Sequence, residues 1–146
     1  MKMWIDTEFN GFGGDLISLA LVSADGKEFY EVLECAAPVE PWVQIHVMPY
    51  LNKDPIPLST FQNKLGKYLK KFGKIELRAD WPTDFELFCK MLITGPGHSI
   101  RTPPLTMEMI TGLGDTATRS AIPHNALEDA RAFRDMELGI TFDENL

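Results

Sequence analysis

Cysteine is scarce in this sequence: Cys35 and Cys89 are the two thiols among 146 residues, with no CxxC spacing and no pairing with histidine. This scarcity excludes a disulfide scaffold and a structural zinc site. Long apolar runs are also missing, because no stretch approaches the roughly 20 residues that span a bilayer. The first residues lack the apolar core of a secretory signal. We therefore expect a cytoplasmic protein with reduced thiols and no membrane partner.

Basic charge is scarce as well, since 14 lysines and arginines stand against 21 aspartates and glutamates, for a net charge of −7. Such a balance argues against holding nucleic acid by broad electrostatic attraction, and it implies weak nonspecific affinity. It does not exclude an enzyme that acts on nucleic acid, because a cluster of acids with bound divalent ions would account for part of the excess. Length and a hydrophobic content of 45% fit one globular domain over 1–146.

Strand patterns dominate the first part of the chain. The first half of the stretch 3–10 is apolar and suits a pleated sheet, and alternating residues mark 15–24 and 27–33. Asp25-Gly26 between the last two segments is a strong hairpin signal. We therefore expect three antiparallel strands at the start of the fold.

Helical patterns begin after a proline-rich segment. Residues 35–57 predict a loop with one short helical turn over 42–46. Apolar residues at helical spacing then predict a helix over 59–72, with Ser59 as its N-cap. We expect Trp4, Trp42 and Trp81 to be core residues.

A second pair of elements follows. Residues 74–79 predict a fourth strand, and a helix begins near Pro82 with Thr83 or Asp80 as its cap. The composition of residues 105–110 predicts a further short strand.

The last helix has a clear start signal. Asn125 and Glu128 are spaced as the two partners of a capping box. This spacing predicts a helix from Ala126 to about Leu138.

Two carboxylates end the first predicted strand. Asp6 and Glu8 are separated by one residue, so both side chains project from the same strand face. Adjacent acids repel each other, and a dry site raises the pKa of one of them unless a divalent cation lies between them. Hard oxygen ligands favour magnesium or manganese over zinc. An acid-x-acid triplet is common by chance in an acidic chain, so it gains meaning only with further carboxylates and a base.

More acids lie at the edges of later elements. Asp80 and Asp84 follow the predicted fourth strand, and Asp129 lies in the first turn of the last helix, with His124 five residues earlier. Three acidic positions at element edges, with a histidine beside the last, form a more specific set than any one of them.

This set resembles the motifs of the DEDDh 3′→5′ exonuclease family, the group of RNase T and the proofreading exonucleases. Asp6-Thr7-Glu8 is similar to the first motif, 79–88 to the second, and 124–130, with its His-x4-Asp pattern, to the third. Within the family, the chain resembles most the compact exoribonucleases of mycobacteria and phages. The resemblance implies an α/β, RNase H-like fold, in which helices flank a mixed central sheet whose first three strands are antiparallel.

The resemblance also implies a catalytic set of four carboxylate ligands and a histidine general base: Asp6, Glu8, Asp84, Asp129 and His124. The carboxylates would hold two Mg²⁺ or Mn²⁺ ions, and an imidazole accepts a proton from water near neutral pH. Thr83 stands where the family usually has an aromatic residue, so Asp80 remains an alternative to Asp84 as the ligand in the second motif.

Candidates for holding the terminal nucleotide lie near these acids: Thr7, Phe9, Asn10, Phe12 and Asp80. Backbone amides and aromatic rings after the first motif would supply hydrogen bonds and stacking, although either phenylalanine also suits the core. Arg101 and Arg119 are candidate phosphate contacts. A lysine stripe on the predicted 59–72 helix and just beyond it is either a solvated face or a phosphate track: Lys64, Lys67, Lys71 and Lys74.

The implied activity is hydrolysis of single-stranded 3′ ends to nucleoside 5′-monophosphates, on RNA more readily than on DNA, and relatives are often homodimers. Two alternatives remain open. One is a catalytically inactive nucleic-acid-binding or interaction module on the same fold, against which the intact acids argue. The other is an RNase H-type endonuclease, over which the His-x4-Asp pattern favours the exonuclease.

Overall fold

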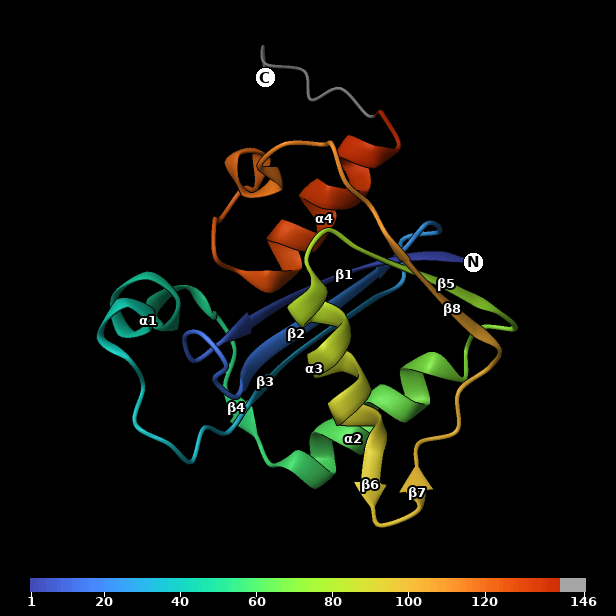
Figure 1. Cartoon of the computed structure of the whole chain (residues 1–146), viewed down its shortest axis with the longest axis horizontal. Coiled ribbons are helices and arrows are strands. Elements are labelled where there is room, and N and C mark those ends of the chain that lie inside the picture. The colour runs from blue at the N-terminus through green and yellow to red at the C-terminus, as the bar shows by residue number, and fades with distance from the viewer. Residues whose placement is uncertain (140–146) are drawn as a thin grey trace.

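A mixed six-stranded sheet organises the chain, and the computed structural model describes residues 1–139 of it. The strand order across the sheet is β4-β3-β2-β1-β5-β8 (Figure 1). The strands are β1 (Lys2–Phe9), β2 (Leu16–Ser23), β3 (Glu28–Leu33), β4 (Pro55–Ile56), β5 (Ile75–Ala79) and β8 (Leu105–Met109). The first three pair antiparallel, and β5 runs parallel to both β1 and β8. The expected fold class is therefore confirmed; residues 140–146, part of the expected domain, lie outside the described residues.

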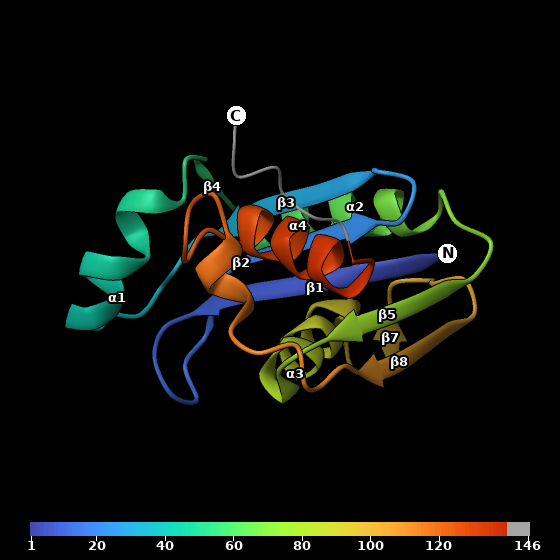
Figure 2. The ribbon, with the colours of Figure 1, turned by 90° about the horizontal axis from the view of Figure 1, so that it is seen from above.

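Helices cover both faces of this sheet. They are α1 (Pro41–His46), α2 (Leu58–Leu69), α3 (Pro82–Leu92) and α4 (Ala126–Glu137), with 3-10 turns η1 (Met48–Tyr50) and η2 (Thr116–Arg119). A small hairpin, β6 (Ile93–Gly95) with β7 (His98–Ser99), follows α3. The helix α4 lies on one face of the sheet, and α2 and α3 pack on the other (Figure 2). Among the described residues, no helix is both long and apolar enough to cross a membrane.

Two helix N-caps differ from the prediction because a proline lies at or directly after each of them, although α3 begins at Pro82 as expected. The N-cap of α2 is Pro57, whose carbonyl accepts from Phe61 N at 2.9 Å, so Ser59 lies inside the first turn and does not cap the helix. The N-cap of α3 is Trp81, in extended conformation before Pro82, and neither Asp80 nor Thr83 caps it. A residue before proline is disfavoured in the helical region, which explains this boundary.

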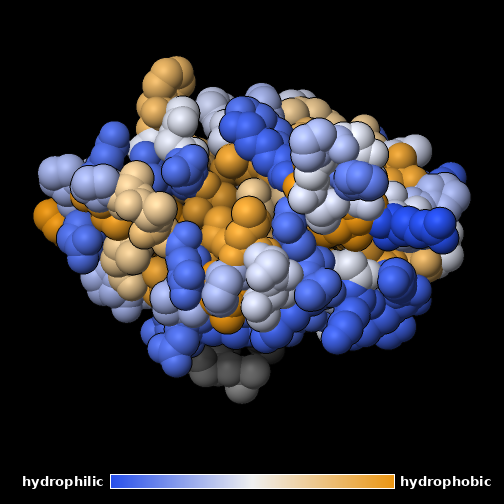
Figure 3. Space-filling model, turned by 90° about the horizontal axis from the view of Figure 1, so that it is seen from below, coloured by the Kyte–Doolittle hydropathy of each residue, from blue (hydrophilic) through white to orange (hydrophobic). Residues whose placement is uncertain are grey.

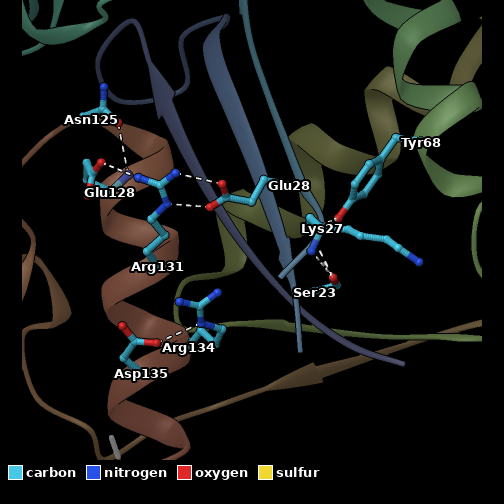
Figure 4. Close-up of polar contacts among 9 residues, drawn as sticks. All are labelled: Ser23, Lys27, Glu28, Tyr68, Asn125, Glu128, Arg131, Arg134 and Asp135. Atoms are coloured by element: carbon cyan, nitrogen blue, oxygen red, sulfur yellow. Dashed lines mark hydrogen bonds and ion pairs between the residues drawn. The ribbon is translucent and has the colours of Figure 1, made fainter. Parts of the chain in front are cut away.

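The last helix starts where the capping box predicted. Asn125 is its N-cap and accepts from Glu128 N at 3.1 Å. Arg131, one turn later, donates to Glu28 of β3 at 2.7 Å and to Glu128 at 2.6 Å (Figure 4). These contacts hold α4 across the sheet.

One of the three tryptophans is in the core. Trp4 on β1 is fully buried and donates to Glu137 of α4 at 2.6 Å. Trp42 and Trp81 are 54% and 61% exposed, so the expectation of core positions is wrong for both. Each lies beside a proline at a helix start, where it projects outward from the sheet layers.

Candidate active site

Four elements bring their acidic side chains to one end of β1. Asp6 and Glu8 lie near the end of β1, and Asp80 directly follows β5, its parallel neighbour. Asp84 lies in the first turn of α3 and Asp129 in the first turn of α4. Carboxylates near helix N-termini are stabilised by the helix dipole, so these positions suit acids even before a cation is considered.

The acids form two groups that share one residue. Asp6, Asp80 and Asp84 have carboxylate oxygens within 4.8 Å of one another, and so do Asp6, Glu8 and Asp129. The structure therefore brings together all four acids predicted as ligands. It also brings in Asp80, so the two candidates from the second motif lie in the same group.

Three of the acids around Asp6, namely Asp80, Asp84 and Asp129, each use one oxygen in a hydrogen bond. Asp84 Oδ1 accepts from the Thr7 hydroxyl at 2.6 Å and from Thr7 N at 3.2 Å. Asp80 Oδ2 accepts from the Thr116 hydroxyl at 2.9 Å, and Asp129 Oδ2 accepts from His124 N at 3.2 Å. These bonds orient the three carboxylates, and the second oxygen of each carboxylate takes no part in them.

Within this cluster of described residues, two carboxylate oxygens are buried without any hydrogen-bond partner: Asp6 Oδ2 and Asp129 Oδ1. A buried anionic oxygen without a donor is costly, because it has lost its water and gained nothing in return. An all-oxygen set with two such atoms fits Mg²⁺ or Mn²⁺, which prefer hard ligands.

The same crowding changes the proton affinity of the acids. Burial, then repulsion from Asp84 and Glu8, raises the pKa of Asp6 well above its ordinary value. Burial and the charge of Asp129 raise the pKa of Glu8 to about 9. Burial raises the pKa of Asp84 to about 7 and that of Asp129 to about 6, although hydrogen bonds partly offset both increases. A divalent cation would relieve this repulsion and let the carboxylates ionise.

His124 lines a cavity of about 470 Å³ together with Asp6, Glu8 and Asp129. Its backbone has φ 67°, in the left-handed region that a non-glycine residue rarely adopts. The imidazole packs edge-on against Trp42, with ring centroids 5.2 Å apart. The predicted base therefore lies beside the acids in a strained and restrained conformation, as functional residues often do.

A second cavity of about 610 Å³ opens on the same acids. It is lined by four of the five candidates for nucleotide binding, namely Thr7, Phe9, Phe12 and Asp80. Phe12 is fully exposed, whereas Phe9 is half-buried and also packs on the core.

Asn10 does not reach this cavity. Its side chain donates to Pro38 O at 2.9 Å and accepts from Glu40 N at 2.8 Å, so it ties the loop after β1 to the segment before α1. The loop approaches that segment closely at Gly11, where a Cβ would meet the Glu40 carboxylate at 2.1 Å. Gly11 also has φ 74°, a further reason for glycine there.

Trp42 and Trp81 also line the 610 Å³ cavity, and sequence reasoning missed them. Their sequence context could have indicated this: each lies beside a proline and outside the regular spacing of apolar residues that marks a buried helix or strand face. Arg101 and Arg119 line two other hollows, away from the acids.

Comparison with models of protein families finds no match, and no curated protein sequence matches the chain. Among solved structures, exonuclease X in complex with 5′ overhanging duplex DNA is similar, with a TM-score of 0.56 and 15% sequence identity. The alignment covers 96% of this chain and 90% of that one. At this identity the similarity establishes the fold: the chain has the mixed α/β arrangement of an exonuclease with an RNase H-like fold.

Proposed function

We propose that this protein is a metal-dependent 3′→5′ exonuclease that acts on single-stranded ends, on RNA in preference to DNA. The observation that carries the proposal is the position of Asp6, which belongs to both carboxylate groups. Two divalent cations held by these groups would stabilise both the attacking and the leaving oxygen of a phosphodiester. An exonuclease of the same fold, described in complex with DNA, supports a nucleic acid as the substrate.

The ligand roles follow from the two groups. Asp6 would contribute to both positions, and Glu8 and Asp129 would complete one of them. Asp84 and Asp80 would complete the other, and Thr7 orients Asp84 through its hydroxyl and amide. The residues that would hold the ions are thus the four acids expected from the sequence together with Asp80.

His124 is the proposed general base. It lines the same cavity as Asp6 and Glu8, where it accepts a proton from water as the water oxygen bonds to phosphorus. The bond from phosphorus to the 3′ oxygen of the preceding nucleotide breaks, and this oxygen takes a proton from solvent. The product is a nucleoside 5′-monophosphate.

Aromatic rings around the 610 Å³ cavity support an unpaired substrate. Phe12, Trp42 and Trp81 are exposed and line this cavity, and every base has a face that stacks on such rings. The preference for RNA rests on the resemblance of the three motifs to compact exoribonucleases.

The test uses 5′-labelled single-stranded RNA and DNA of one sequence with Mg²⁺, Mn²⁺ or EDTA. We expect a metal-dependent ladder that shortens from the 3′ end, faster on RNA, and nucleoside 5′-monophosphate as product. Asp6→Asn should lower the rate by about a thousandfold or more, because it removes the shared ligand.

Other results would favour the alternatives. Internal cuts indicate an endonuclease, and binding without cleavage indicates an inactive module on the same fold. Cleavage that persists in Asp6→Asn would reject this site. Light scattering of the same samples measures whether the protein is the homodimer that the resemblance implies.

A further inference from the structure

A basic groove lies between α2 and the segment that follows β7, outside the candidate active site. It has a volume of about 270 Å³, and its cations are Lys67, Lys70 and Arg101. Asn63, Gly66 and Ile100 complete its surface with Gln62, and no carboxylate lines it. Figure 3 shows strongly hydrophilic side chains on the side of the molecule where α2 ends.

Within residues 1–139, no carboxylate neutralises these three cations, because none of them forms an ion pair with one. Two other lysines on or beside α2 are engaged: Lys64 pairs with Glu31 at 3.2 Å, and Lys71 lies over the Tyr68 ring at 5.6 Å. In a chain of net charge −7, three cations around one hollow, none paired with an acid of the described residues, are a local reversal of the overall sign.

The backbone brings these cations together from two sides. Asn63, Lys67 and Lys70 are spaced i, i+4 and i+7, so they share one face of α2. Arg101 comes from the opposite wall. Gly66 permits the close approach of that wall, because a Cβ there would lie 3.3 Å from Ile100.

The groove is connected to the candidate active site through α3. Gln62 on its edge donates to Met91 O at 3.2 Å and to Ile93 O at 2.9 Å, at the end of α3. Asp84 lies at the other end of the same helix. The helix rise puts Asp84 and Met91 about 10 Å apart along the axis. The cations of the groove lie beyond Met91, so a strand that reaches both places must be longer than this span; single-strand binding sites occupy about 4–16 nucleotides.

We propose that the basic groove binds phosphodiester groups of the substrate strand, on the 5′ side of the nucleotide that is removed. The proposal rests on the proposed function and adds where the rest of the strand lies. Arginine binds phosphate through a planar pair of donors, and lysine supplies a compact charge, so the groove has both kinds of phosphate ligand.

Lys67 and Lys70 have a second physical role that the experiment must separate. Cations in the last turn of a helix interact favourably with the helix dipole and stabilise the helix. This effect alone would favour lysine at these positions. Arg101 lies outside α2, so the dipole does not account for it. The decisive variant therefore includes Arg101.

The experiment compares two variants with equal loss of charge: Lys67→Gln with Arg101→Gln in the groove, and Lys71→Gln with Lys74→Gln outside it. Fluorescence anisotropy measures binding of a labelled single-stranded 12-mer, RNA and DNA, in EDTA so that no cleavage occurs. We expect the groove variant to bind about tenfold more weakly. The slope of log affinity against log salt should fall by about 1.4, at about 0.7 per phosphate contact on a single strand. The control variant should bind within about twofold of the wild type.

Thermal unfolding of both variants establishes that they fold. An unchanged slope in the groove variant, or an equal loss in the control, would overturn the proposal. A third arm of the experiment is a titration with inorganic phosphate alone. If phosphate binding requires Arg101 but binding of the 12-mer does not, the groove is a site for free anions instead. A wild type that neither binds nor cuts the 12-mer refutes the proposed function. If the wild type cuts the 12-mer and the groove variant binds the 12-mer as tightly as the wild type, the groove proposal is refuted and the proposed function is not.

Discussion

Thr7 lies between the two acids of β1 and contacts a third. Its hydroxyl donates to Asp84 Oδ1 at 2.6 Å and its amide to the same oxygen at 3.2 Å, which lowers the pKa of Asp84 against the effect of burial. The bond holds this carboxylate in one orientation, with its other oxygen available to a cation. Thr7 thus acts on the site through Asp84.

Replacing Thr7 by valine keeps the shape of the side chain and removes the hydroxyl donor. We expect the Mg²⁺ concentration for half-maximal cleavage to rise about tenfold, because partners of metal ligands are worth about 10–100-fold in metal affinity. Thr7→Ser, which keeps the donor, should stay near the wild type. The measurement is a Mg²⁺ titration of the initial rate; equal behaviour of both variants would contradict the role of the hydroxyl.

At the scale of elements, α4 carries the last carboxylate, Asp129, and His124 lies just before the N-cap of this helix. Asn125 caps the helix through Glu128 N, and its amide donates to Tyr50 O at 2.8 Å. The cap therefore fixes where α4 begins relative to the segment that holds α1. Asp129, in the first turn, takes its position from this start.

Asn125→Ala should lower the free energy of unfolding by about 1–2 kcal/mol, the usual cost of losing an N-cap. Ser59→Ala is the matched control, because Ser59 lies inside α2 and caps nothing; we expect a change within about 0.5 kcal/mol. Urea denaturation of the two variants measures both values. A larger loss for Ser59→Ala than for Asn125→Ala would mean that the caps are assigned wrongly.

For the whole molecule, the acidic cluster sets how stability depends on pH. Burial and mutual repulsion raise the pKa of Glu8 to about 9, that of Asp84 to about 7 and that of Asp129 to about 6. The same groups titrate near 4 in the unfolded chain. Between these values the folded state binds more protons, so its free energy of unfolding falls as the pH rises. The ion-paired Glu28 and Glu137 have lowered pKa values, so their contribution is complete above about pH 4.5 and does not oppose this trend.

We therefore expect the metal-free protein to lose about 5 °C in Tm between pH 5.5 and 8.5, equivalent to a kcal/mol or two for a chain of this size. Saturating Mg²⁺ should restore the loss by binding the folded state. Asp6→Asn should flatten the pH profile and abolish most of the Mg²⁺ effect. Calorimetry at several pH values measures this, and a Tm that rises with pH in EDTA would contradict the account.

Local sequence signals predicted much of the fold and of the candidate site. The three antiparallel strands and the start of α4 follow from alternation, the Asp25-Gly26 turn and the Asn125 cap, each a matter of neighbouring residues. The five acids and His124 were found because their spacing along the chain matches three motifs. The N-caps Pro57 and Trp81 were missed because proline sets the backbone at both helix starts, where side-chain caps had been expected.

From the sequence alone, local backbone preference predicts individual strands and helices, and the resemblance of three motifs implies the α/β class, the acidic set and divalent ions. Packing between segments that are far apart in the sequence decided the remaining features of the site. It made Asp6 common to two groups, exposed Trp42 and Trp81 along the cavity, turned Asn10 away from it, and set Arg101 opposite Lys67 and Lys70. These outcomes depend on which elements meet across the sheet, and the periods of single helices and strands do not contain that information.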